Sequence, residues 1–267
     1  MLDQITPVII AFNEEPNLAR TLEKLRWARE VVVLDNFSSD RTPEIVASFD
    51  NTRLVQKRYQ GQADNWQTAV FESGVSSDWV LALDADYVIS NRLVEELRTL
   101  DPPDGVGGYR ARFVYGIMGR PLRGSLYPPV TVLFQLARAR YIQDGHTQRV
   151  VVQGEVLPLK GRIFHDDRKP LGRWLASQDR YARQEAALIR QMGWSRLGWS
   201  RRIRKLVIMA PFLVLLHTLI VKGAVLDGRA GWYYAFQRLT AELILSMHLL
   251  QLRLTPAEAE RDEEATS

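Results

Sequence analysis

Three short apolar runs in the first 90 residues each stop at acidic or amide side chains. They are Pro7–Phe12 (followed by Asn-Glu-Glu), Val31–Asp35 and Trp79–Leu83 (followed by Asp-Ala-Asp). Uncharged runs of this kind are typical of strands buried on both faces of a parallel sheet, although the pattern alone also allows a buried helical segment. Stretches with helical spacing lie between them, which predicts βαβ units. The carboxyl ends of parallel strands share one edge, so the acids should gather there.

Asp84 and Asp86 are the most informative pair at this edge. In an extended chain, residues two apart point to the same side, so both carboxylates would sit together where the strand ends. Two carboxylates in one place repel each other unless a cation or donor groups offset their charge. A hard divalent ion such as Mg²⁺ or Mn²⁺ takes oxygen ligands and bridges to substrate phosphates. The alternative for such a short motif is a solvated acidic turn.

Composition narrows the class of protein. The chain has 267 residues, 46% of them hydrophobic, which is enough for one large or two modest globular domains. It contains no cysteine, which excludes disulfides, thiol nucleophiles and cysteine metal sites and suits a reducing compartment. The N-terminus lacks the basic start and long apolar segment of a signal peptide, so we expect a cytoplasmic protein.

After Leu100 the pattern changes from alternating strands and helices to strands joined by irregular loops. The segment Gly119–Pro129 is too rich in Pro and Gly for regular structure and predicts a long loop. Residues 130–141 predict a single strand, and Val150–Val156 predicts a hairpin around Gln153 and Gly154.

Taken in order, the segments PVIIAFNEE, VVVLDNFSSDRT and WVLALDADY resemble the family 2 glycosyltransferases with a GT-A fold. Those enzymes have a strand ending in Phe/Tyr-Asn-Glu, then D-x-x-S-x-D-x-T, then D-x-D. The Asn-Trp pair at 65–66 and the Leu-Asp-Gly at 226–228 add a similarity to bacterial glucosyltransferases of the lipopolysaccharide-core type. The resemblance is strong over residues 5–99. It implies an α/β protein with a GT-A (Rossmann-like) mixed sheet and helices on both faces.

The resemblance implies a nucleoside site at the ends of the first two strands. Ala11, Phe12 and Glu14 match the segment that packs against the nucleoside and reaches its ribose. Asp35 matches the acid that reads the base. Each residue also has a structural alternative: Phe12 as a core residue, Glu14 as a helix cap and Asp35 as a turn residue at the strand end.

The resemblance also implies roles for the two acids of the D-x-D motif. Asp84 would face the donor, and Asp86 would hold a divalent metal, Mn²⁺ or Mg²⁺, on the diphosphate. Asn65, from the matching Asn-Trp helix, is included among the donor-binding residues. One position departs from the family, because relatives often have Glu after the D-x-D and this chain has Tyr87. An acceptor role at that position is therefore weakened.

An inverting transfer needs a general base within hydrogen-bond reach of the acceptor hydroxyl. Many relatives place Glu or Asp directly after a His in the segment that corresponds to residues 144–149. In this chain His146 is followed by Thr147. Asp144 is the nearest carboxylate, and it is our candidate catalytic base. The alternative is that these residues form a polar turn.

The segment RIFHDDRK, residues 162–169, brings one histidine and two acids beside three cations. In several GT-A enzymes a late His completes the metal shell, which makes His165 the second candidate metal ligand, and imidazole suits Mn²⁺. Arg168 and Lys169 would neutralise the departing diphosphate. The alternative for His165 is a structural role.

The sequence of the last third of the chain predicts helices that associate with a membrane. Leu206–Val221 is apolar apart from a His and a Thr, with a kink expected at Pro211, and its length of about 24 Å is short of a ~30 Å hydrocarbon core. After a turn at 222–231, residues 232–252 predict a second helix whose charges favour packing against the first. With the basic residues of 196–205, the pair resembles a monotopic anchor at an anionic surface. A soluble helical pair, facing itself or a twin subunit, is the alternative.

These patterns predict a GT-A domain over residues 1–168, a helical membrane-associated region over 169–254 and a disordered acidic tail over 255–267. The expected function is a metal-dependent inverting glycosyltransferase, of hexosyltransferase type, at the cytoplasmic face of the inner membrane. It would move a sugar from a nucleotide-diphosphate donor, a UDP-sugar, to a lipid-linked or cell-envelope glycan, without a nucleic-acid partner. The alternatives are a nucleotide-sugar-binding protein without turnover and a nucleotidyltransferase, which the lack of a glycine-rich phosphate loop disfavours. The oligomeric state stays open.

Overall fold

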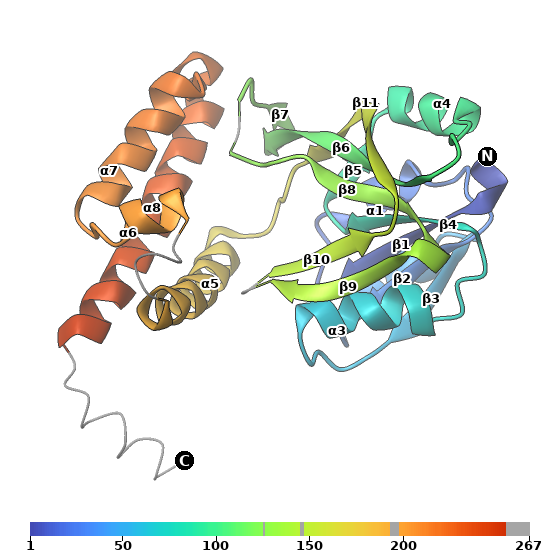
Figure 1. Ribbon diagram of the computed structural model, residues 1–267, viewed down its shortest axis with the longest axis horizontal. Coiled ribbons are helices and arrows are strands. Elements are labelled where there is room, and N and C mark those ends of the chain that lie inside the picture. The colour runs from blue at the N-terminus through green and yellow to red at the C-terminus, as the bar shows by residue number, and fades with distance from the viewer. Residues whose placement is uncertain (125, 145–146, 193–197, 255–267) are drawn as a thin grey trace, which may run out of the picture. The chain divides into compact units, whose positions relative to one another are not determined.

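The structure is a computed structural model that describes residues 1–124, 126–144, 147–192 and 198–254. It divides into two compact units, Met1–Lys169 and Pro170–Ser267. Within the described residues, every strand belongs to the first unit, and the second is built from helices (Figure 1). The acidic tail expected at 255–267 lies outside the described residues.

The first unit is organised around a mixed sheet. Its strands follow the order β3-β2-β1-β4-β8-β6-β11-β5, with β7 added beside β6. The first four strands in this order run parallel to one another, and β8 joins β4 and β6 in antiparallel fashion. The bounds are β1 Ile5–Ala11, β2 Val31–Asp35, β3 Thr52–Gln56, β4 Trp79–Asp84, β5 Tyr87–Ile89, β6 Val106–Ile117, β7 Arg120–Pro121, β8 Val130–Gln135 and β11 Glu155–His165.

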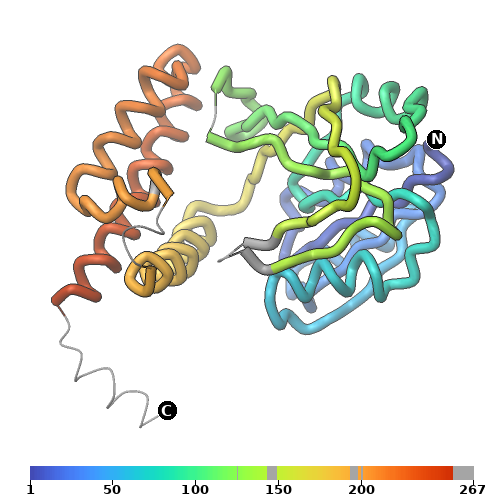
Figure 2. Tube along the Cα trace, in the orientation of Figure 1, coloured from blue at the N-terminus to red at the C-terminus, as the bar shows by residue number. Residues whose placement is uncertain are grey.

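Helices cover both faces of the parallel strands because alternate strand residues enter two separate cores. Val31 and Val33 join one core with residues of α1, α2 and α4, whereas Val32 and Leu34 join a second core with α3. The bounds are α1 Leu18–Glu23, α2 Thr42–Ala47, α3 Gln62–Gln67 (continued by a π-helical turn over Thr68–Glu72) and α4 Asn91–Thr99. The Cα trace shows α3 and α4 on opposite sides of the sheet (Figure 2). The predicted α/β architecture with doubly buried strands is confirmed.

The prediction of a hairpin over Val150–Val156 is wrong. Strand β10 (Thr147–Val152) pairs with β9 (Ala139–Asp144), while β11 leaves Gly154 to join the main sheet. Gly154 has φ +101°, and a Cβ there would lie 2.3 Å from the Gly105 carbonyl oxygen. The small β9–β10 ribbon packs against α3, where Tyr141 stacks on Trp66 with ring centroids 5.5 Å apart. Residues 130–141 are also not one strand, since a 3-10 turn at Leu136–Arg138 separates β8 from β9.

The second unit contains α5 (Leu171–Gln191), α6 (Trp199–Arg204), α7 (Met209–Leu216) and α8 (Gly228–Leu254). As expected, α7 packs on α8, and α8 also packs on α5. The apolar helix starts later than predicted, at Met209, because Val207 has φ +47°. Pro211 does not kink it, since the residue lies in the first turn, where its missing N–H has no helical partner to lose. A π-helical turn over His217–Val221 and a short 3-10 helix over Ala224–Asp227 join α7 to α8.

No single helix among the described residues is both long enough and apolar enough to cross a bilayer. The stretches Met209–Val221 and Ala224–Leu254 pass that test only when they are taken together, and they are bent by 67° where they meet.

Candidate functional site

Three parallel strands end together and bring the acids predicted from the sequence to one edge. Ala11 of β1 lies opposite Asp35 of β2, and Ile10 lies opposite Asp84 of β4. After Asp84 the chain turns through Ala85 and Asp86 and enters β5. Asp86 therefore sits in the turn that follows the strand and not, as expected, in extended chain.

Hydrogen bonds connect the loop after β1 to the loop after β2. Side chains of the D-x-x-S-x-D-x-T pattern accept them. The backbone N–H of Asn13 donates to Oγ of Ser38 at 2.7 Å, and that of Glu14 donates to Oγ1 of Thr42, also at 2.7 Å. Asp40 accepts from the backbone N–H groups of Glu15 at 3.1 Å and Thr42 at 3.0 Å. These hydrogen bonds fix the loop that carries Phe12 and Glu14.

Asp35 and Phe12 differ sharply in exposure. Asp35 is fully buried and accepts hydrogen bonds from the backbone N–H and hydroxyl of Ser38 and from Nε2 of Gln56 at 3.1 Å. Phe12 has half of its surface exposed, and Ala11 is buried in the core. Phe12 is thus half-exposed at the edge, whereas the carboxylate of Asp35 is buried and hydrogen-bonded within the protein.

Glu14 lies in a buried ion pair that closes the edge on one side. Nζ of Lys169 is 2.8 Å from Oε1 of Glu14 and 3.3 Å from Oδ1 of Asp167, and Nδ2 of Asn17 donates to Oε2 of Glu14 at 2.9 Å. Burial raises the pKa of Glu14 to about 7, against the opposing charge of Lys169. The charges of Glu14 and Asp86 raise the pKa of Lys169 although burial opposes them. Glu14 and Asp86 therefore share one cation.

The acids of the D-x-D motif are close enough to influence each other and have very different pKa values. Burial, and next the charge of Asp86, raise the pKa of Asp84 to about 6. Burial would raise the pKa of Asp86 too, but His165 and Lys169 outweigh it and lower that pKa to about 2. Nε2 of His165 lies 3.1 Å from Oδ2 of Asp86. Burial would lower the pKa of His165, yet Asp86 and Asp84 raise it above its ordinary value.

An aromatic cluster that sequence reasoning missed surrounds His165. The rings of Tyr87, Tyr115 and Tyr127 have centroids 5.1, 4.8 and 4.9 Å from the imidazole. The hydroxyl groups of Tyr87 and Tyr127 are hydrogen-bonded to each other, and Tyr87 also bonds to Asp84. Burial raises the pKa of both hydroxyl groups, so both stay neutral near pH 7. Tyr127 comes from the loop predicted over Gly119–Pro129, which is thereby docked beside the acids.

Arg168 lies in a second charged cluster next to Lys169. Its Nε is 2.8 Å from Oδ2 of Asp166, and NH1 of Arg20 is 3.1 Å from the same oxygen. The backbone N–H of Gly119 also donates to this carboxylate at 3.0 Å. Burial and the nearby charge of Arg168 lower the pKa of Arg20. The contact between Arg20 and Asp166 spans 146 positions in sequence, and no local pattern could have found it.

Two of the predicted site residues are not brought to this group of side chains by any contact of the described residues. Asn65 is fully buried and exchanges amide hydrogen bonds with Asn36, at 2.7 and 3.2 Å. Asp144 is the last residue of β9, opposite Thr147 of β10. The side chains of residues 143–148 lie outside the described part of the structure, so Asp144 has only a backbone position.

The donor set suits a divalent cation that is completed by a ligand. Asp86 is ionised at neutral pH, His165 is adjacent, and Nδ1 of His165 is buried without a hydrogen-bond partner. No three Asp, Glu, His or Cys side chains in the described part of the chain gather closely enough to hold an ion by themselves. Mg²⁺ and similar ions are commonly bound through one or two carboxylates plus substrate phosphates, so two protein ligands fit such an ion.

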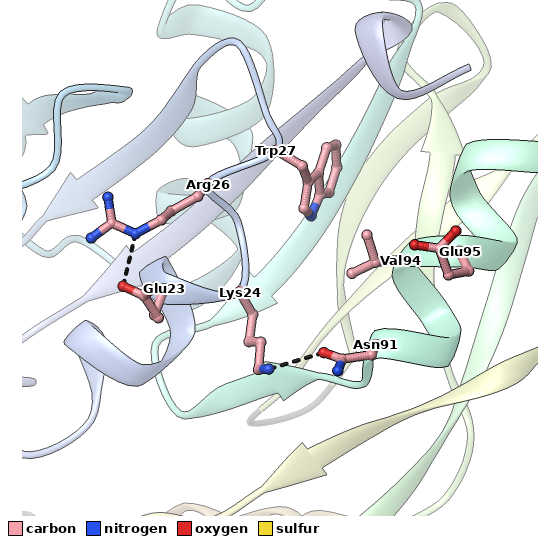
Figure 3. A pocket seen from close by; sticks show the side chains of 7 residues that line it. All are labelled: Glu23, Lys24, Arg26, Trp27, Asn91, Val94 and Glu95. Atoms are coloured by element: carbon pink, nitrogen blue, oxygen red, sulfur yellow. Dashed lines mark hydrogen bonds and ion pairs between the residues drawn. The ribbon is translucent and has the colours of Figure 1, made fainter.

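A separate pocket of about 240 Å³ lies between the end of α1 and the start of α4, and none of the predicted site residues lines it. Its walls are paired with each other, because Nζ of Lys24 donates to Oδ1 of Asn91 at 2.9 Å and Arg26 pairs with Glu23 at 2.8 Å (Figure 3).

The comparisons with known proteins agree on one family. Residues 6–125 match the family described as Glycosyl transferase family 2. The chain is 33% identical over 97 residues to an uncharacterised glycosyltransferase of Rickettsia typhi, an alignment that covers 36% of this chain and 32% of that relative. It is 26% identical over 271 residues to the lipopolysaccharide core biosynthesis glycosyltransferase LpsC of Rhizobium meliloti, covering 93% and 94% of the two chains.

Among solved structures, the crystal structure of S. aureus TarS residues 1–349 in complex with UDP-GlcNAc is similar, with a TM-score of 0.47 and 14% identity over 93% of this chain and 91% of that chain. Glucosyl-3-phosphoglycerate synthase from Mycobacterium tuberculosis, in complex with Mn²⁺ and UDP, has a TM-score of 0.33 and 21% identity over 42% and 44% of the two chains. Residues 6–125 thus match the glycosyl transferase family 2, and over most of its length the chain is similar to a glycosyltransferase.

Proposed function

We propose that this protein is a metal-dependent inverting glycosyltransferase with a GT-A fold that moves a sugar from a UDP-sugar to a cell-envelope glycan. The observation that carries the proposal is the meeting of Glu14, Asp84, Asp86, His165 and Lys169 at the carboxyl edge of β2, β1 and β4. In open α/β sheets ligands bind outside the carboxyl ends of the strands. Acidic side chains around one lysine form a site short of positive charge, which a divalent ion carried on the diphosphate would supply.

The nucleoside would lie against the loop after β1. The half-exposed Phe12 would pack against the nucleoside, and Glu14, in the same loop, would reach a ribose hydroxyl. Asp35 is fully buried beneath Ser38, so reading the base with this acid requires Ser38 or Gln56 to exchange a hydrogen bond with the base. The nucleoside part of the proposal therefore rests more on Phe12 and Glu14 than on Asp35.

Asp86 and His165 would hold the divalent ion, and Asp84 would face the sugar. When bound, the ion would neutralise the diphosphate as it leaves. His165 has to be neutral to serve as a ligand, and because Asp86 and Asp84 raise its pKa, a bound ion would compete there with a proton. Lys169, which already compensates Glu14 and Asp86, and Arg168 beside it would add positive charge for the leaving group.

The base that takes the proton of the acceptor hydroxyl is Asp144 in this proposal. A carboxylate at this point would accept the proton as the hydroxyl attacks the sugar from the face opposite to the diphosphate. The similarity to LpsC over 93% of the chain supports an acceptor of the lipopolysaccharide-core kind, that is, a lipid-linked or envelope glycan.

The experiment that tests the function is transfer or hydrolysis from a panel of nucleotide sugars with Mn²⁺ or Mg²⁺, with products identified by mass spectrometry. The proposal predicts release of UDP and a sugar-bearing product from one UDP-sugar. Donor binding without release of the sugar would favour a binding protein that has lost turnover. Release of pyrophosphate from a nucleoside triphosphate would favour nucleotidyl transfer.

The variant Asp144→Asn tests the catalytic base. Loss of a general base costs roughly 10² to 10⁴ in rate, so transfer should fall by that factor while affinity for UDP stays the same. Thr147→Ser, a conservative change directly across the ribbon, is the matched control and should keep its rate. Full transfer activity in Asp144→Asn would reject Asp144 as the base.

A further inference from the structure

The helical unit exposes many large apolar side chains, and they follow its α7–α8 hairpin. On α7 the exposed residues include Met209, Phe212 and Leu216, each more than half exposed and spaced three or four apart on one face. The connection continues the surface, with Ile220 and Val221 among the most exposed apolar residues of the chain, at 70% and 74%. Single exposed apolar residues are ordinary, but a continuous set of this size marks an interaction surface.

Exposed apolar residues also form a stripe along helix α8. Its exposed apolar residues recur at steps of four, seven, four, three and four, which keeps them on one face of an α-helix. The residues facing the other way, among them Leu245 and Leu249, are buried in the core of the helical unit. The stripe consists of Trp232, Phe236, Leu243, Met247, Leu250 and Leu254.

The charge of the chain is concentrated in this same unit. Residues 170–254 contain 13 Lys and Arg against 4 Asp and Glu, an excess of nine positive charges. Residues 1–169 are close to balanced, with 21 basic and 22 acidic residues, and residues 255–267 have one Arg and five acids. The formal net charge of +4 for the whole chain therefore hides a strongly basic helical unit.

Two of the four acids of this unit are buried in ion pairs with its arginines, and a third, Asp179, pairs with Arg183 at 2.6 Å. Glu242 is 2% exposed and pairs with Arg204 at 2.8 Å, and Glu185 is 5% exposed and pairs with Arg201 at 2.9 Å. The sequence suggested that the basic run at 196–205 faces an anionic surface, but part of that run neutralises buried acids instead. The outward charge includes Lys222 and Arg229, which flank the connection between α7 and α8, and Arg253 at the far end of the stripe.

We propose that the α7–α8 hairpin of this unit, residues 206–254, docks on the surface of an anionic lipid bilayer. An apolar face bordered by cations is complementary to acyl chains beneath negatively charged headgroups. A second copy of the chain is disfavoured as the occupant, because pairing the same surface would bring two strongly basic units together. Nucleic acid would satisfy the charge but would leave the apolar side chains in water.

The hairpin lies on the bilayer and does not cross it. The stretches that contain α7 and α8 qualify as a span only in combination, and a 67° bend separates them. The Arg204–Glu242 pair sits on the packed side of α8, so no buried ion pair has to enter lipid when the exposed stripe does. The connection from Ile220 to Leu226 would then insert at the level of the headgroups and the first methylene groups.

Co-sedimentation of the full chain with vesicles tests the proposal. The probes are vesicles of phosphatidylcholine alone and vesicles with about one third phosphatidylglycerol, at low and at physiological ionic strength. We expect binding to the anionic vesicles, weakened several-fold but not abolished by salt, because the apolar contact is insensitive to screening. The double variant Ile220→Asn/Val221→Asn should lower the bound fraction at least tenfold. Its side chains are largely exposed, so its thermal unfolding should match that of the wild type.

A matched control is Tyr59→Asn, which removes a large exposed side chain, 61% exposed, from the first unit and should leave vesicle binding unchanged. Lys222→Gln/Arg229→Gln should weaken binding to anionic vesicles and leave binding to neutral vesicles as it is. The proposal is overturned if no vesicle binds the wild type, if the apolar variant binds as well as the wild type, or if that variant instead turns a dimer into a monomer in light scattering. A DNA duplex is the competing probe. If the duplex binds the chain as well as anionic vesicles do, and binds the apolar variant as well as the wild type, the proposal is also overturned.

Discussion

The two units each contain a cluster of buried charge, and the clusters are built in opposite ways. In the first unit three acids, Glu14, Asp84 and Asp86, face one lysine and one histidine. In the helical unit Glu185 and Glu242 meet two arginines. The first cluster is short of positive charge and the second is balanced.

The difference separates a binding site from a structural ion pair. A balanced pair of buried charges holds helices in register and leaves no unpaired charge to bind a ligand. Burial raises the pKa values of Glu14 and Asp84, so holding these carboxylates ionised costs stability. A ligand that brings positive charge offsets this cost, which is why a divalent cation, carried in with a nucleotide, fits the first unit and not the second.

Removing an acid from the balanced cluster should have the largest effect on stability. Glu242→Gln leaves Arg204 without its main partner in a largely buried place, and we expect a loss of roughly 3 kcal/mol in the free energy of unfolding. Asp84→Asn removes the acid of this cluster whose pKa is raised to about 6, and it should change stability far less. Urea denaturation followed by circular dichroism measures both. Equal losses in the two variants would remove the distinction between the clusters.

The acid-rich cluster should make stability depend on pH through Glu14. Its folded pKa of about 7 lies above its ordinary value of 4.5, so its contribution is fully present below pH 4.5 and is lost as the pH rises through 7. At pH 8 the ionised Glu14 should cost about 2 kcal/mol relative to pH 5. The variant Glu14→Gln should lack this loss, as measured by thermal and urea unfolding at both pH values.

Glu44→Gln, a change on the exposed face of α2, is the control for Glu14→Gln and should follow the wild type at both pH values. If the difference in stability between Glu14→Gln and the wild type is the same at pH 5 and pH 8, Glu14 does not titrate in this range.

The hydroxyl of Tyr127 should contribute a smaller amount. It bonds to Tyr87, which in turn bonds to Asp84, and a buried hydrogen bond contributes about 1 kcal/mol. Tyr127→Phe keeps the ring contacts with His165 and should lose about that much stability. Tyr59→Phe, with its side chain in solvent, should lose nothing. A Tyr127→Phe variant as stable as the wild type would mean that the hydroxyl pair is not formed.

Much of the first half of the fold could be predicted because its signals are local. The apolar runs ending in acids gave the parallel strands, their order along the chain and the edge at which Asp35, Asp84 and Glu14 meet. The leucines of α1 point to one core because their helical spacing can be read directly. These elements are short, contiguous and consistent with their own propensities.

The remaining features depend on contacts between distant parts of the chain. Lys169 meets Glu14, and Tyr127 meets Tyr87, without any sequence signal that pairs them. The predicted hairpin after Val150 failed because β10 pairs with β9 while β11 pairs with β6, and no local pattern shows these partners. Arg201 and Arg204 likewise pair with buried acids, although the sequence alone suggested that they face an anionic surface. Local patterns give elements and candidate residues, while tertiary packing decides their partners.

The central claim is that the acid-rich edge binds a nucleoside diphosphate together with a divalent cation. Isothermal titration of UDP into the full chain, with Mn²⁺ and then with EDTA, tests it most directly. The account predicts binding that requires Mn²⁺ and that weakens at least 100-fold, about 2.7 kcal/mol, in Asp86→Ala. UDP binding that is equally strong with EDTA, or unchanged in Asp86→Ala, would contradict it.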